Sequence, residues 1–183
     1  MNLPNALTVS RLILVPVFLL ALFAEGGHNT TWRWIASGIF AVAAITDRYD
    51  GHIARKRGQV TDFGKIADPI ADKALTGSAL IGLSMLGDLA WWVTIVILIR
   101  EIGVTMLRFA VIRNGVISAS PGGKAKTFVQ IIAIALYLMP LPDGIDVVRI
   151  AAMGLAVILT VGTGIDYVVR AAAFYPRAKP GPG

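Results

Sequence analysis

Between two apolar stretches, the chain reads Asp47-Arg48-Tyr49-Asp50-Gly51-His52-Ile53-Ala54-Arg55, and after eight further residues it places Gly64, Asp68 and Asp72. The aspartates within each pair are three or four residues apart, so two helices would present each pair on one face. An antiparallel pair of such helices could point all four carboxylates into one pocket. Because acidic residues are costly near a bilayer and persist there mainly for function, we interpret this pattern as a metal and phosphate site.

The composition predicts an all-α integral membrane protein. Of the 183 residues, 56% are hydrophobic and 15% are charged, and apolar runs recur along the whole chain. We expect one domain over residues 1–175 with six transmembrane helices, a retained first span in place of a cleaved signal, and a disordered tail over 176–183. The expected helices lie near residues 6–24, 33–57, 67–87, 90–113, 124–141 and 146–171. Predicted loops contain Gly26-Gly27, Gly87-Asp88, Pro121-Gly122-Gly123 and Pro140-Leu141-Pro142.

The basic residues indicate how the chain is oriented in the membrane. The net charge is +6, and the lysines and arginines concentrate at alternate ends of the apolar segments. The positive-inside rule then places both termini and the aspartate motif in the cytoplasm, with a prokaryotic inner membrane as the natural location. We therefore expect membrane lipid and an anionic substrate as partners, and no nucleic acid. Tryptophans expected in a belt at the other face are Trp32, Trp34, Trp91 and Trp92.

The motif offers carboxylate ligands alone, with no histidine or cysteine at ligand spacing. Oxygen ligands of this kind select hard cations such as Mg²⁺ or Mn²⁺. Four carboxylates in one pocket would repel one another, so we expect one or two divalent ions to neutralise them. Two ions about 4 Å apart would suit an in-line displacement at phosphorus. Gly51, Ala54 and Gly64 leave room for a ligand, and Arg55 offers a planar donor fork for phosphate.

The complete motif resembles the signature of the CDP-alcohol phosphatidyltransferases at every position. That family consists of six-helix membrane enzymes, usually homodimers, which displace CMP from a CDP-linked lipid with an alcohol nucleophile and divalent metal. The resemblance implies that the metal ligands are Asp47, Asp50, Asp68 and Asp72. It makes Asp72 also the base that deprotonates the alcohol. It implies that the CDP site comprises Asp47, Asp50, Gly51, Ala54, Arg55, Gly64 and Asp68.

Further segments resemble the branch of this family whose acceptor is glycerol 3-phosphate. They cover residues 2–11, 100–108, 123–127 and 164–167. The resemblance implies transfer of the phosphatidyl group from CDP-diacylglycerol to glycerol 3-phosphate, with release of CMP. Two alternatives are weighed against it. One keeps the chemistry but uses inositol phosphate, serine or phosphatidylglycerol as acceptor, and the other is a divalent-cation transporter.

The basic residues of these segments suit a phosphate-bearing acceptor. Arg100, Glu101 and Arg108 share one face of their helix and should face the bundle interior, paired or bound to an anion. Lys124 and Lys126 begin a helix, where backbone N–H groups also favour phosphate. The expected acceptor-phosphate residues are Arg100, Arg108, Lys124 and Lys126.

Simpler interpretations of these and two other residues stay open. Arg100 and Glu101 could form an internal ion pair that only fixes helix packing, and the two lysines could be ordinary positive-inside residues. We interpret Asp62 as a solvated loop residue. Asp166 is expected to cap its helix or to pair with Arg170.

Overall fold

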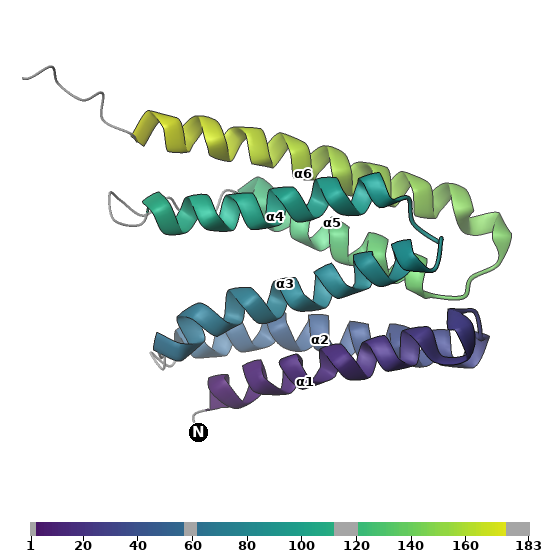
Figure 1. Cartoon of the computed structure of the whole chain (residues 1–183). Helices are drawn as coiled ribbons and strands as arrows, with labels where there is room; N and C mark the ends of the chain where they lie inside the picture. The colour runs from purple at the N-terminus through teal and green to yellow at the C-terminus, as the bar shows by residue number, and fades with distance from the viewer. Residues whose placement is uncertain (1–2, 57–61, 112–120, 175–183) are drawn as a thin grey trace, which may run out of the picture.

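A computed structural model describes the backbone of residues 3–56, 62–111 and 121–174. Within these ranges the chain is all-helical, with six α-helices and two short 3₁₀ helices (Figure 1). They are α1 (Leu3–Phe23), η1 (Ala24–Gly27), α2 (Thr30–Lys56), α3 (Asp62–Met85), α4 (Trp91–Val111), α5 (Pro121–Leu138), η2 (Asp143–Ile145) and α6 (Asp146–Phe174). Side chains are described in these ranges except at residues 3–8, 47–56, 62–70, 72, 108–111, 121, 143 and 173–174. The expected tail over 176–183 lies outside the described residues.

Each of the six expected helices is present, and two predicted loop positions are wrong. Pro121 and the two glycines after it form the first turn of α5, not a loop. A proline is favoured in the first helical turn because its missing N–H would have no intrahelical acceptor there. Asp62, interpreted as a loop residue, begins α3.

The helices form two groups of three, α1 to α3 and α4 to α6 (Figure 1). The groups meet where α2 packs on α5 and where α3 packs on α4 and α5. At one end of the bundle lie the start of α1, the end of α2, the start of α3 and the end of α6. We call this the aspartate end, because the motif over residues 47–72 spans the last turns of α2 and the first half of α3.

The apolar core occupies the half of the bundle away from the aspartate end. Phe18 of α1 and Phe40 of α2 are fully buried there, with ring centroids 6.0 Å apart. Leu83, Ile97 and Leu138 extend this core into α3, α4 and α5. The described core therefore holds the two groups together in this half of the molecule.

Ion pairs and carbonyl contacts join the helices at the end opposite the aspartates. The Arg33 guanidinium of α2 contacts the Asp88 carboxylate at 2.7 Å and also donates to the Tyr137 carbonyl of α5. Arg149 of α6 donates to the carbonyls of Leu136, in the last turn of α5, and of Met139 and Leu141, just after that helix. Carbonyls at the end of a helix lack intrahelical donors, so the arginine contributes to satisfying them and ties α6 to the end of α5.

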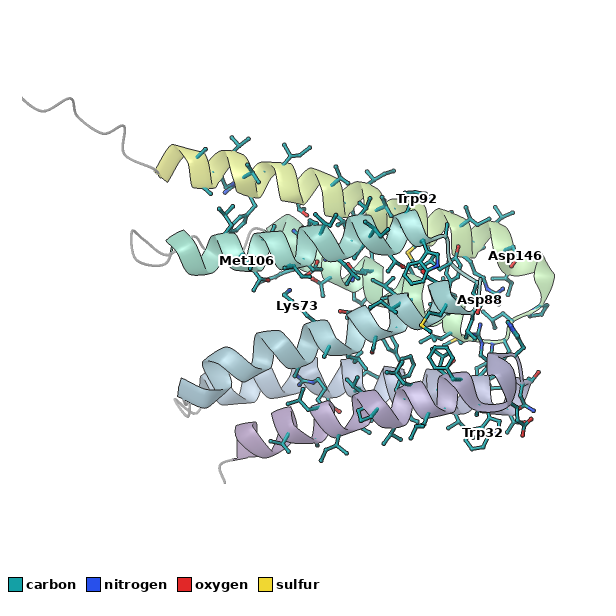
Figure 2. The ribbon with its side chains drawn as sticks, viewed as in Figure 1. Trp32, Lys73, Asp88, Trp92, Met106 and Asp146 are labelled. Carbon is teal, nitrogen blue, oxygen red and sulfur yellow. The ribbon has the colours of Figure 1, made fainter. Side chains whose placement is uncertain are left out.

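Two helices among the described residues are long and apolar enough to cross a membrane. They cover Val9–Gly27 and Asp146–Ala172. The four tryptophans expected in a belt are all exposed, and Trp32 and Trp92 lie in the half of the bundle away from the aspartate end (Figure 2).

Candidate active site

The backbone places all four motif aspartates on helices that are adjacent at the aspartate end. Asp47 and Asp50 lie in the last turns of α2, and Asp68 and Asp72 lie in the first half of α3. Both aspartate pairs therefore lie within helices, as the sequence predicted, so the two members of each pair share one helix face. The side chains of these residues, and those of Gly51, Ala54, Arg55 and Gly64 in the expected CDP site, lie outside the described set.

The donor chemistry of the motif fits a hard divalent cation. The chain has no cysteine, and its two histidines, His28 and His52, are not repeated at ligand spacing. Among the described side chains, no group of three histidines, cysteines, aspartates or glutamates could hold a metal ion. In the described part of the chain nothing competes with the four aspartates as a place for Mg²⁺ or Mn²⁺.

A second polar feature lies between the aspartate end and the apolar core. The Glu101 carboxylate of α4 contacts the ammonium of Lys73 from α3 at 2.8 Å and the guanidinium of Arg100 at 3.1 Å. It also forms an ion pair with Lys126 from α5. Arg100 donates to the Thr163 hydroxyl of α6 at 2.8 Å. We call these residues the Glu101 cluster: Lys73, Arg100, Glu101, Lys126 and Thr163.

The Glu101 cluster joins four helices and carries an excess of positive charge. In Figure 2, Lys73 extends from α3 into the space between the two helix groups. Three cations surround one carboxylate, so the described side chains of the cluster leave two positive charges uncompensated. The Lys126 side chain is only 2% exposed. Because buried like charges repel strongly, such an arrangement is suited to receiving an anion.

The expected acceptor-phosphate residues divide between this cluster and its surroundings. Arg100 and Lys126 meet at Glu101. Lys124 is exposed and, two residues from Lys126, points about 200° away around α5. The side chain of Arg108 lies outside the described set, so its expected role stays a prediction.

Both ion pairs weighed from the sequence are present, and two residues of the cluster were missed. Arg100 pairs with Glu101, and Asp166 pairs with Arg170 at 2.9 Å. Lys73 and Thr163 were not predicted to join a site. Lys73 did carry a signal, because a lysine within a predicted membrane helix is a functional candidate by default. Thr163 carried none, since threonines in apolar helices commonly bond their own helix backbone.

Comparison with known proteins assigns the chain to a family. A family model described as CDP-alcohol phosphatidyltransferase matches residues 1–162, which include the aspartate motif and all of the Glu101 cluster except Thr163. The chain belongs to the CDP-alcohol phosphatidyltransferase family. Enzymes of this family are transferases associated with membranes, and they generally use divalent metal ions. The family resemblance expected from the aspartate motif is thereby confirmed.

Curated relatives within this family carry a narrower name. A protein named probable phosphatidylglycerophosphate synthase from Mycobacterium tuberculosis (strain H37Rv) is 62% identical over 170 residues, covering 93% of this chain and 81% of the relative. The CDP-diacylglycerol–glycerol-3-phosphate 3-phosphatidyltransferase of Bacillus subtilis (strain 168) is 40% identical over 179 residues, covering 91% and 93%. The enzyme of the same name from Rickettsia felis is 36% identical over 171 residues, with the same coverage.

Proposed function

We propose that this chain transfers the phosphatidyl group of CDP-diacylglycerol to glycerol 3-phosphate, giving phosphatidylglycerophosphate and CMP. One observation carries the choice of acceptor. The buried Glu101 cluster has more positive than negative charge and adjoins the helix that bears Asp68 and Asp72. A phosphate-bearing acceptor would supply the missing negative charge, and the names of the relatives agree with this chemistry.

In this proposal the aspartates act on the diphosphate and on the acceptor hydroxyl. Asp47, Asp50, Asp68 and Asp72 would hold two divalent metal ions, Mg²⁺ or Mn²⁺. The ions would polarise the diphosphate and neutralise the charge on departing CMP. Gly51, Ala54, Arg55 and Gly64 would line the CDP site.

The transfer itself is a single displacement at phosphorus. Asp72 takes the proton from the acceptor hydroxyl. The hydroxyl oxygen then forms a bond to the phosphorus that carries diacylglycerol, and the bond from that phosphorus to CMP breaks. The acceptor's phosphate would bind among Arg100, Arg108, Lys124 and Lys126, which holds the hydroxyl near Asp72. Positioning and charge neutralisation then provide most of the rate enhancement.

The membrane setting is part of the proposal. The six helices would all span a prokaryotic inner membrane, as one domain over residues 1–175, with both termini and the aspartate end in the cytoplasm. The lysines and arginines near that end support this orientation through the positive-inside rule. We propose that the enzyme works as a homodimer, with the acyl chains of its lipid substrate remaining in the bilayer.

A competition among acceptors tests the function. Detergent-purified protein with Mg²⁺ should release CMP from CDP-diacylglycerol when glycerol 3-phosphate is added. Inositol phosphate, serine and a sample without acceptor should release little. Release with serine would contradict a phosphate-binding pocket, and release with inositol phosphate would keep the pocket but change the acceptor. Folded protein that releases no CMP with any acceptor would contradict the transferase function.

Gly164 of α6 offers a second test through Arg100. A Cβ atom at position 164 would lie 3.1 Å from Arg100 Cγ and 3.7 Å from its Nε, whereas one at position 162 would meet nothing within 4 Å. Gly164→Ala should therefore shift the Arg100 side chain by a few tenths of an ångström, weaken its contact with Thr163 and raise the KM for glycerol 3-phosphate by about threefold. Gly162→Ala, two residues away in the same helix, is the matched control and should leave the KM unchanged. Equal KM values in the two variants would contradict a role of Arg100 in acceptor binding.

A further inference from the structure

Glu101 is the only described carboxylate in contact with Lys73, Arg100 or Lys126. Its two carboxylate oxygens accept hydrogen bonds from different cations. Oε1 accepts from Arg100 and Lys126, and Oε2 accepts from Lys73 at 2.8 Å. Each cation comes to the carboxylate along a different path, since Lys73 lies on α3, Arg100 on α4 and Lys126 on α5. A single side chain therefore sets where three positive charges stand relative to one another.

The burial of the cluster makes this arrangement depend on Glu101. Lys126 is 2% exposed, Glu101 14% and Arg100 16%. Lys73, at 27%, is the most exposed of the four. Water screens repulsion only weakly where side chains are buried, so without the carboxylate the cations would separate. Lysine and arginine side chains also have many rotamers, and the ion pairs restrict them to one arrangement.

The same residue links the aspartate helix to the basic residues of the other helix group. Lys73 follows Asp72 directly in α3, and its ammonium reaches Glu101 across the boundary between the groups (Figure 2). Lys126 reaches the same carboxylate from α5. Through the one carboxylate, these two ion pairs connect α3 with α5.

We propose that Glu101 is a positioning residue for the acceptor: it holds Lys73, Arg100 and Lys126 where they bind the acceptor's phosphate and so sets the distance from that phosphate to Asp72. This inference rests on the proposed function. It assigns Glu101 no contact with substrate, and it adds Lys73 to the residues that bind the phosphate. Glu101 acts only through the three cations that it contacts.

Glu101→Gln tests the proposal, with Asp88→Asn as the matched control. Both changes remove one carboxylate charge from a partly buried ion pair and keep the shape of the side chain. The two residues differ in position, because Asp88 lies at the end of the bundle away from the four motif aspartates (Figure 2). Glu101→Gln should raise the KM for glycerol 3-phosphate by about tenfold, while the KM for CDP-diacylglycerol changes by less than about twofold. Asp88→Asn should lower the thermal midpoint in detergent and change neither KM.

Two further variants keep the test decisive. Glu101→Asp keeps the charge on a shorter side chain and should give a KM between those of the wild type and Glu101→Gln. In the double variant Glu101→Gln/Lys126→Met, the effect on KM should be smaller than the product of the single effects, because both changes disturb one ion pair. A purely structural role would instead lower stability and leave the KM for glycerol 3-phosphate unchanged, which would overturn the proposal. The proposed function is tested separately, by the acceptor competition with wild-type protein. That competition shows whether glycerol 3-phosphate is the acceptor, whatever the Glu101 variants do.

Discussion

Replacing Asp72 with asparagine should lower CMP release by about 10³-fold or more. Asparagine keeps the size of the side chain but cannot accept the proton of the acceptor hydroxyl and is a weaker ligand for a hard cation. Asp68→Asn should also abolish most turnover, because it removes a negative ligand from the same helix. Both variants should still insert into membranes, since the helix and its apolar core are untouched. The measurement is CMP release at saturating CDP-diacylglycerol and glycerol 3-phosphate.

The metal dependence of these two variants separates the roles of the aspartates. Raising the Mg²⁺ concentration should restore part of the activity of Asp68→Asn, whose defect is weaker metal binding. It should restore little to Asp72→Asn, which has also lost its base. Asp62→Asn is the matched control, because Asp62 lies on the same helix but outside the motif, and its activity should stay within about twofold of wild type. Near-normal turnover in both motif variants would contradict the assignment of the site.

The sequence was sufficient to predict the helices and the aspartate motif. Apolar runs separated by glycine and proline turns have a strong local signal, so all six helices were located correctly within the described residues. The motif was found for the same reason, because the two aspartates of each pair are only three or four residues apart in one helix. The loop predicted at Pro121 was wrong because proline and glycine also occur in the first turn of a helix, where the backbone donors are unpaired in any case.

The Glu101 cluster could not be predicted, because it depends on contacts between helices. Lys73 and Lys126 are 28 and 25 residues from Glu101 in sequence, and no local pattern shows that they share one carboxylate. The sequence left an ion pair between Arg100 and Glu101 open as one interpretation, and the structure contains that pair. The sequence did not show that Glu101 also contacts Lys73 of α3 and Lys126 of α5.

Hydrophobic patterning also fails to show which face of α5 is buried. Phe128 is exposed while Lys126, two residues earlier, is fully buried. In a helix that faces lipid, the outer surface is as apolar as the core, so an alternating pattern does not identify the interior. The polar side chain then indicates the interior only when a partner is known to be there. For Lys126 that partner is Glu101, and the structure was needed to reveal it.

Lys126→Met should lower kcat/KM for glycerol 3-phosphate by about 10²-fold, mainly through a higher KM. Methionine has nearly the length of lysine and suits a buried position, so the change removes the charge without leaving a large cavity. Glu101 keeps its contacts with Lys73 and Arg100, so the carboxylate is not left buried without a partner. The fold should therefore survive, and the loss should come from weaker binding of the acceptor's phosphate.

Lys124→Met is the matched variant, because it removes the same charge two residues away in the same helix. Lys124 is exposed, so water and salt weaken its interaction with a bound phosphate, and the expected loss in kcat/KM is only about twofold to fivefold. The affinity of each variant for CDP, measured calorimetrically with Mg²⁺, should match that of the wild type, because the CDP site is assigned to α2 and α3. Equal losses in the two lysine variants would contradict a specific role of Lys126. They would mean that the positive charges near the start of α5 attract the acceptor only through their combined electrostatic field. The greater loss expected for Lys126 follows from its burial against Glu101, where a single charge is neither screened by solvent nor replaced by a neighbour.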